Sequence, residues 1–293
     1  MTHPLNADLA WALWDDEPIA GAFAFDRPDA PPDVAVVRSV ARPWLLGYTP
    51  AEPNGRALLI LGGGGYTQLM VGREGYQVAR WLTALGFHAL VLVHRFPNAE
   101  TGPQAPLNDA RRALALIDEQ DLAPAGLGIV GLSSGGHLAA SLLADYPATW
   151  RESDPLRASA LPRPAMAVIG YAPISTNAAG RTIVPDKPPL APPAKQALYD
   201  ALQPDVQLGS TPPPIFIVYA TNDPVVPVVN AYRLTEALTR AGTPVELHVF
   251  ADAPHGFAMD TAGLPVSRWP ALCEGWMRQA GFLPDISAHE DVA

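Results

Sequence analysis

The chain has 293 residues, of which 48% are hydrophobic and 16% are charged, so it has the composition of a packed globular protein and not of a disordered one. Its 19 basic and 29 acidic side chains give a net charge of −10, which argues against a nucleic-acid or anionic-membrane partner because both require clustered positive charge. The single cysteine, Cys273, excludes an intrachain disulfide and a multi-cysteine metal site.

The first twenty residues do not have the pattern of a secretory signal. They lack a basic start, and Asp15, Asp16 and Glu17 stand where the apolar core of a signal would run. No stretch reaches 18 uninterrupted apolar residues, so no membrane span is expected. These observations predict a soluble protein in the cytoplasm.

Short apolar runs alternate along the chain with stretches of helical periodicity. The runs predict strands over Val34–Val40, Ala57–Leu61, Ala89–Val93, Leu127–Val130, Ala165–Ile169, Ile215–Tyr219 and Val245–Phe250. The periodic stretches predict helices over Tyr76–Leu85, Leu107–Gln120, His137–Asp145, Ala194–Leu202, Val228–Ala241 and Ser267–Gln279. This alternation predicts an α/β protein with a mostly parallel central sheet and helices on both faces.

No shift in composition divides the chain, so we expect a single domain over residues 1–293. Prolines cluster in the longest interruption of the pattern, from Ser175 to Thr211. Such a segment is expected to form a short cap or lid over a site.

A run of four glycines, from Gly62 to Gly65, follows the strand predicted at Ala57–Leu61. At the carboxyl edge of a parallel sheet, its bare backbone N–H groups could complete an oxyanion hole. A phosphate-binding loop is the alternative, but no Gly-Lys-Ser/Thr sequence follows. On its own the run also fits a flexible loop.

A G-x-S-x-G sequence follows the strand predicted at Leu127–Val130, with Ser133 at its centre. A strand, this sharp turn and a helix together expose a serine hydroxyl at the edge of the sheet. Gly131 and Gly135 suit a turn too tight for side chains, and the N–H of Ser134 would point at a developing oxyanion. A structural glycine turn without catalytic use is the alternative.

A nucleophilic serine requires a base, and the base requires a carboxylate to orient it. Asp223 follows the strand predicted at Ile215–Tyr219, and His255 follows the strand predicted at Val245–Phe250. The order Ser133, Asp223, His255 is that of α/β-hydrolases. We therefore predict that these three side chains form a catalytic triad. Arg95 is expected to pair with Asp109 as part of the structure.

Several stretches resemble the acetyl-esterase and xylanase-B-like branch of the α/β-hydrolases, from about Leu58 to Met277. They are the glycine run ending in Tyr66, Glu74-Gly75 with Ala79 and Trp81, Gly131-x-Ser133-x-Gly135-Gly136-His137-Leu138-Ala139, Asp223-x-x-Val226-Pro227 and His255-Gly256-Phe257. The sequence departs from the branch at Gly62, where proline is frequent, and at Ser134, where alanine is usual. Neither change blocks a role of the backbone.

The resemblance implies a role for each matching residue. Ser133 is the expected nucleophile, His255 the general base and Asp223 its orienting carboxylate. Ser134 with Gly64 or Gly65 would supply the oxyanion donors. Apart from the resemblance, Tyr66 and Tyr171 are expected to line a pocket and bind substrate.

These residues predict a serine carboxylic-ester hydrolase that requires no metal and no organic cofactor. The resemblance implies a small-molecule substrate, an acetyl ester of a carbohydrate such as a xylo-oligosaccharide. An amidase, formamidase or peptidase would use the same triad. A hydrolase-fold protein that binds a ligand without turnover is the alternative from another class.

Overall fold

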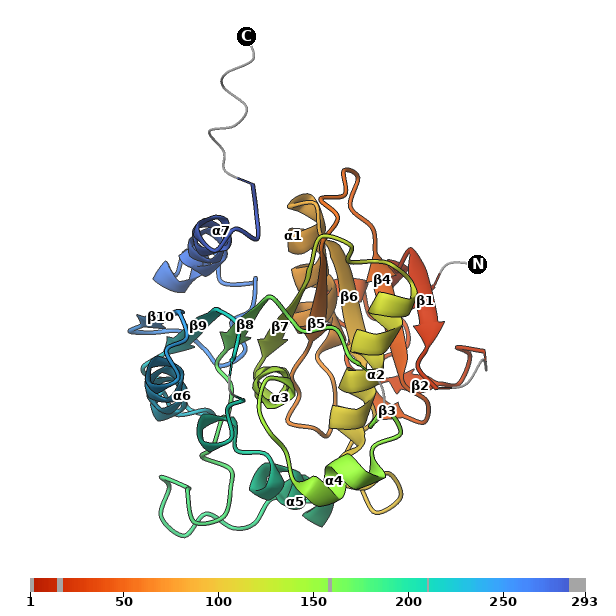
Figure 1. Cartoon of the computed structure of the whole chain (residues 1–293). Helices are drawn as coiled ribbons and strands as arrows, with labels where there is room; N and C mark the ends of the chain where they lie inside the picture. Colours follow the sequence, from red (N-terminus) through yellow and green to blue (C-terminus); the bar gives the residue numbers. More distant parts are fainter. Residues whose placement is uncertain (1–2, 15–17, 158–159, 210, 285–293) are drawn as a thin grey trace.

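The structure, a computed structural model of the chain, describes residues 3–14, 18–157, 160–209 and 211–284. Eight strands form one sheet in the order β1-β4-β6-β5-β7-β8-β9-β10 (Figure 1). Their bounds are β1 Leu9–Ala12, β4 Trp44–Tyr48, β5 Ala57–Leu61, β6 His88–Val93, β7 Leu127–Leu132, β8 Met166–Gly170, β9 Ile215–Ala220 and β10 Val245–Phe250. A separate two-stranded sheet pairs β2 (Phe23–Phe25) with β3 (Val37–Val40).

The predicted mostly parallel sheet is confirmed. Six of its strands run parallel to one another: β6, β5, β7, β8, β9 and β10. The sequence patterns missed β1 and β4, which add antiparallel strands at the edge beside β6. The strand expected over Val34–Val40 is corrected: residues 32–34 form a 3-10 turn, and the strand itself, β3, begins at Val37. Prolines cluster before β3, and proline cannot donate a backbone hydrogen bond to a strand ladder, so the strand begins later than predicted.

Helices cover both faces of the sheet, as predicted. Helices α1 and α7 lie on one face, and α2, α3 and α6 lie on the other (Figure 1). The bounds are α1 Gln77–Ala84, α2 Ala105–Glu119, α3 Ser134–Leu142, α4 Ala148–Ser153, α5 Pro193–Ala201, α6 Val229–Arg240 and α7 Trp269–Gln279. The indole of Trp81 on α1 donates a 2.7 Å hydrogen bond to Glu274 on α7, which ties the two helices together.

The strand order places two loops side by side. The chain passes from β6 through α2 to β7 and so crosses over β5, which pairs with both β6 and β7. Leu61, the last residue of β5, is in register with Gly131 of β7. Ligands of open α/β sheets bind at the carboxyl ends of strands where the order reverses, so the glycine run and the serine turn lie at the expected position.

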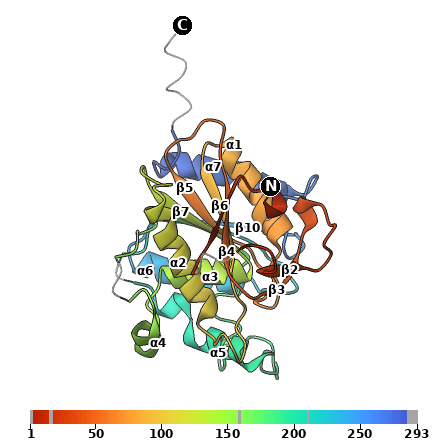
Figure 2. The same ribbon diagram turned by 90° about the vertical axis from the view of Figure 1, so that its right-hand side faces the viewer.

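The chain between β8 and β9 contains α5 and a 3-10 turn at Pro204–Val206. Helices α4 and α5 lie together at one end of the molecule in both views (Figures 1 and 2). Ser210, within the segment expected to form a cap, and the acidic residues 15–17 lie outside the described residues. Within the described chain, no helix has the length and apolar character to cross a membrane.

Candidate active site

Ser133 stands alone between β7 and α3, in the tight turn that the sequence predicts. Its backbone has φ 52° and ψ −126°, a region that side chains rarely adopt and that costs on the order of 1 to 3 kcal/mol. A Cβ atom on Gly135 would overlap the carbonyl oxygen of Leu61, the last residue of the neighbouring strand β5. The turn therefore requires glycine at this position, and it holds the serine side chain at the sheet edge.

A chain of hydrogen bonds links the three side chains that the sequence singles out. Ser133 Oγ lies 2.9 Å from His255 Nε2, and His255 Nδ1 lies 2.7 Å from Asp223 Oδ2. The other oxygen of Asp223 accepts the backbone N–H groups of Val225 at 2.8 Å and Val226 at 2.9 Å. With Nδ1 donating to this carboxylate, Nε2 is free to accept a proton from the serine.

The two side chains that follow Ser133 in this hydrogen-bond chain differ in their contact with water. The Asp223 side chain is 1% exposed and that of His255 is 20% exposed. A buried carboxylate is weakly screened, so its attraction for a protonated imidazole is stronger than it would be in water. The arrangement can deprotonate a hydroxyl and then hold the resulting imidazolium.

Backbone N–H groups beside Ser133 differ in whether they are already bonded. In the part of the chain that the structure describes, those of Ser134 and Gly64 have no acceptor. The N–H of Gly65 donates to Ser134 Oγ at 2.9 Å. Of the two alternatives expected from the sequence, Gly65 thus has its N–H bonded to the Ser134 hydroxyl in this structure. Gly64 has φ +134°, which only glycine readily adopts, and its N–H is the remaining candidate in this loop.

Glu74 is a neighbour of the site to which the sequence analysis assigned no role. It lies on a π-helical turn, Val71–Tyr76, and is 2% exposed. Its carboxylate accepts the N–H of Gly63 at 2.6 Å and the hydroxyl of Tyr171 at 3.0 Å. Burial raises the pKa of Glu74, while these two donors and the nearby His255 lower it. Only its place beside glycine in the family motif could have pointed to it.

Tyr171 packs behind the proposed base. Its ring centroid lies 5.3 Å from that of His255 and 4.5 Å from that of Phe257, both in edge-on geometry. The side chain is fully buried and its hydroxyl is bonded to Glu74. Tyr171 thus orients its neighbours, and its burial does not support the expected contact with substrate.

Tyr66 is also buried, with 1% of its surface exposed. Its hydroxyl bonds to His137 Nδ1 at 2.9 Å, and His137 Nε2 bonds to the carbonyl of Leu202 at 2.9 Å. Burial lowers the pKa of His137 to about 4, so the ring is neutral and takes one donor and one acceptor role. Tyr66 therefore ties the glycine loop to the segment after β8, and it has no exposed ring for the substrate contact that was expected.

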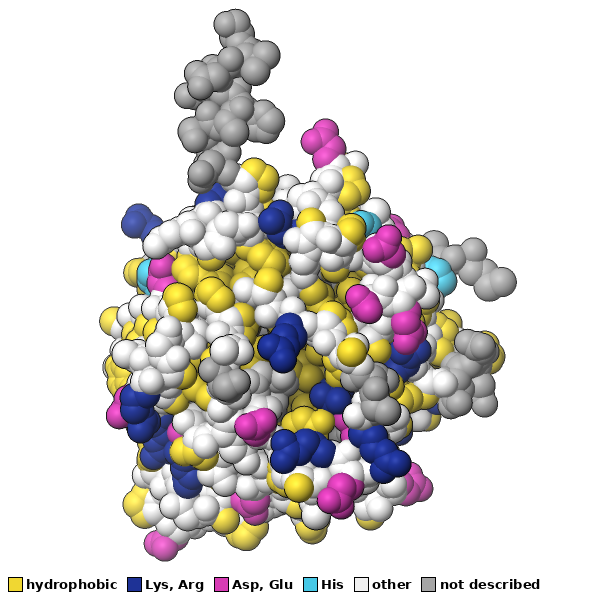
Figure 3. All heavy atoms as spheres, viewed as in Figure 1, with side chains coloured by type: hydrophobic (Ala, Val, Ile, Leu, Met, Phe, Trp, Pro, Cys, Tyr) yellow, Lys and Arg dark blue, Asp and Glu magenta, His cyan; other side chains and the backbone are white. Residues whose placement is uncertain are grey.

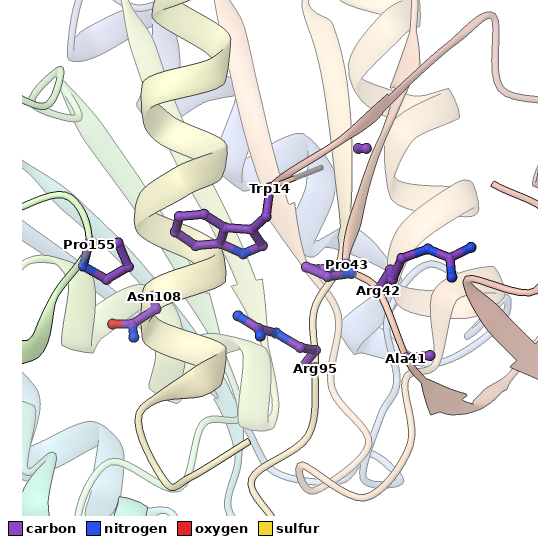
Figure 4. A pocket seen from close by; sticks show the side chains of 8 residues that line it. Trp14, Ala41, Arg42, Pro43, Arg95, Asn108 and Pro155 are labelled. Carbon is purple, nitrogen blue, oxygen red and sulfur yellow. The ribbon is translucent and has the colours of Figure 1, made fainter. Parts of the chain in front are cut away.

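A separate hollow of about 230 Å³ lies between Trp14, Arg95, Asn108 and Pro155 (Figure 4). Asp109, fully buried at its edge, accepts hydrogen bonds from the Trp14 indole at 2.8 Å and from Arg95 Nη2 at 2.6 Å. The predicted structural pairing of Arg95 with Asp109 is confirmed. None of the three residues predicted to form a triad lines this hollow.

The net negative charge does not form one acidic field on the face in Figure 3, where acidic and basic side chains are interspersed. Among the described residues, no group of three or more His, Cys, Asp and Glu side chains is arranged to hold a metal ion.

Comparisons with known proteins identify related sequences. Residues 104–269 match the prolyl oligopeptidase family. An acetylxylan esterase of Xylanibacter ruminicola is 27% identical over 73% of this chain and 43% of the relative. Endo-1,4-beta-xylanase B of Butyrivibrio fibrisolvens is 27% identical over 69% of this chain and 32% of the relative. The chain spans less than half the length of these relatives.

Solved structures share the fold. An acetyl ester-xyloside bifunctional hydrolase from Caldicellulosiruptor lactoaceticus superposes with a TM-score of 0.70 at 27% identity, covering 94% of this chain and 98% of that one. An α/β hydrolase from a deep-sea metagenome superposes with a TM-score of 0.60 at 22% identity, covering 88% of this chain and 97% of that one. The predicted α/β-hydrolase fold is confirmed.

Proposed function

The chain belongs to the prolyl oligopeptidase family, and we propose that within this family it acts as a serine carboxylic-ester hydrolase. The observation that carries this proposal is the relay from Ser133 Oγ through His255 to Asp223, with contacts of 2.9 and 2.7 Å. An unpaired serine would be a poor nucleophile at neutral pH, and this relay supplies the base that it needs.

The reaction proceeds in two steps. His255 takes the proton of Ser133 while Oγ attacks the ester carbonyl, and the oxyanion binds the N–H groups of Ser134 and Gly64. His255 gives the proton to the leaving alcohol, and an acyl-enzyme remains. Water, deprotonated by His255, attacks the acyl carbonyl; the serine recovers its proton and the carboxylic acid leaves.

The substrate that we propose is a short acyl ester, an acetyl group on a carbohydrate of the xylo-oligosaccharide type. Support comes from the relatives that are named as an acetylxylan esterase and an acetyl ester-xyloside hydrolase. The chain between Ser175 and Thr211 would then act as a short cap that shapes the alcohol side. Imported or soluble acetylated sugars are the targets if the protein acts in the cytoplasm.

The family match favours one second candidate, cleavage of an amide bond, because the family is named for an oligopeptidase. An amide needs the same nucleophile, base and oxyanion donors, and it differs in requiring protonation of a poorer leaving group. Turnover rates on a matched panel of p-nitrophenyl acetate and p-nitroacetanilide separate the two activities.

Covalent labelling tests the proposed nucleophile. A fluorophosphonate probe should label the native protein on Ser133, and Ser133→Ala should lower p-nitrophenyl acetate turnover about 10³-fold or more. Ser134→Ala serves as the matched control at the adjacent serine and should still be labelled at Ser133. Unlabelled native protein beside a labelled control hydrolase would instead identify a protein that binds without turnover.

A further inference from the structure

The chain contains two lysines, and all its other basic side chains are arginines. Both lysines lie between β8 and β9, Lys195 on α5 and Lys187 in the loop before this helix. They are close enough for the charge of Lys187 to act on Lys195. The segment that packs at the sheet edge near the triad thus carries a local pair of positive charges in an acidic protein.

Lys195 reaches the loop that holds the proposed oxyanion donor. Its Nζ atom lies 3.6 Å from the position that a Cβ atom on Gly65 would occupy. The N–H of Gly65 is bonded to Ser134, the residue next to Ser133, and Gly64 precedes it in the loop. The ammonium group therefore lies beside the proposed catalytic machinery, although its helix is far from Ser133 in sequence.

Among the described residues, the Lys195 ammonium has no counter-charge. Within the described residues it forms no ion pair and no hydrogen bond, while Lys187 Nζ donates to Asn177 Oδ1 at 2.6 Å. Asp186, which precedes Lys187, is exposed and forms no ion pair in the described chain. Asp200, further along α5, accepts hydrogen bonds from the N–H of Ala179 and from Gln196.

The surroundings of Lys195 oppose its charge. Partial burial lowers the pKa of Lys195, and the positive charge of Lys187 lowers it further. Both causes lower the pKa of Lys195, and no carboxylate raises it. Removing an ammonium from water without a partner is unfavourable, and a bound anion would offset this cost through a charge-assisted hydrogen bond.

We propose that Lys195, with Lys187 beside it, binds a carboxylate group of the substrate next to the Ser133 site. The preferred esters are then anionic: the carboxylate lies on the acyl part, as in a half-ester of a dicarboxylic acid, or on the alcohol part, as in an acetylated acidic sugar. This inference rests on the proposed ester hydrolysis and adds the charge of its substrate.

Two pairs of esters test the inference. The acyl pair is p-nitrophenyl hemisuccinate and the neutral p-nitrophenyl butyrate, and the alcohol pair is 4-acetoxybenzoate and its methyl ester. Lys195→Met retains much of the side-chain stem, and it should lower the anionic-to-neutral ratio of kcat/KM about tenfold or more in one pair. The pair that responds identifies the side of the ester that carries the carboxylate. Lys187→Met should act in the same direction with a smaller effect.

Arg240→Met is the matched control. Arg240 ends α6, shortly before β10 begins, so it lies at the opposite edge of the sheet from the triad. This variant removes the same charge and should leave the ratio unchanged. A ratio that Lys195→Met alters in neither pair would overturn the inference, as would a wild-type preference for the neutral ester in both pairs.

Failure of the proposed function would be visible separately, as a lack of Ser133-dependent turnover of every ester. The anion site is then judged by calorimetric titration of succinate into the wild-type protein and into Lys195→Met. Binding that is weakened about tenfold or more in the variant supports the site. Equal binding, or no binding to either protein, contradicts it.

Discussion

The buried carboxylate of Glu74 accepts a 2.6 Å hydrogen bond from the backbone N–H of Gly63, the residue before the proposed oxyanion donor. The same carboxylate accepts the hydroxyl of Tyr171, whose ring packs on the proposed base. One side chain is thus bonded to the glycine loop and, through Tyr171, positioned against the histidine loop. This geometry makes Glu74 a positioning residue, and its substitution should alter catalysis without removing a reacting group.

Glu74→Gln should lower kcat on p-nitrophenyl acetate about tenfold and change KM much less, because the loop binds charge that develops in the transition state. Glu236→Gln, on the exposed face of α6, is the control. Steady-state kinetics distinguish the two parameters. A loss confined to KM would contradict a positioning role.

The same substitution should affect stability in a pH-dependent way. Burial raises the pKa of Glu74 in the folded protein, so the carboxyl favours folding below its ordinary pKa and loses this contribution as the pH rises through the folded value. Glu74→Gln removes this loss of stability at high pH, because the amide does not titrate. We therefore expect the Tm difference, variant minus wild type, to be more positive at pH 8 than at pH 4, measured by scanning calorimetry. A difference that is independent of pH would contradict this linkage.

Gly135→Ala should destabilise the protein by about 3 kcal/mol or more, because its Cβ would overlap the backbone of β5 in a core without free space. Gly275, on α7, has no atom within 4 Å of an added Cβ and lies on an exposed face of a helix. Gly275→Ala should therefore raise stability by roughly 0.5 to 1 kcal/mol. Urea unfolding of both variants measures the contrast, and equal effects would contradict the packing argument.

The buried histidine on α3 predicts sensitivity to acid. The folded pKa of His137 is lowered to about 4, below its ordinary value, so the unfolded chain binds the proton first as the pH falls. The contribution of His137 to the free energy of unfolding should be fully present above about pH 6.5. It should fall by on the order of 3 kcal/mol between that pH and pH 4. His137→Gln retains a donor and an acceptor and should lose this part of the pH dependence in chemical denaturation. Parallel pH profiles for the two proteins would contradict the prediction.

Acyl specificity should favour small groups. We expect kcat/KM for p-nitrophenyl acetate to exceed that for the hexanoate by roughly tenfold or more, since each misfitting methylene costs about 1 to 3 kcal/mol in a closed pocket. Release of acetate from an acetylated xylo-oligosaccharide should also be measurable. Faster turnover of long acyl chains would refute the carbohydrate proposal and leave the serine mechanism intact.

The amino-acid sequence by itself predicted the central parallel strands, the turn at Ser133 and the chain order of the three triad side chains. These features depend on local patterns: apolar runs that form buried strands, glycines that permit a tight turn, and loops at strand ends. The catalytic roles of the three residues remain predictions. The sequence patterns also gave no indication of β1 and β4, whose pairing at the sheet edge depends on contacts across the chain.

Only the tertiary structure decided which groups meet around the proposed nucleophile. It brought the Ser134 hydroxyl to the N–H of Gly65, the Glu74 carboxylate to the N–H of Gly63, and the Lys195 ammonium to the side of Gly65. The members of the last pair are 130 residues apart, and no local periodicity encodes such a contact. A buried polar group is bonded by whichever donor the packing brings near, so these partners follow from the three-dimensional arrangement of the loops.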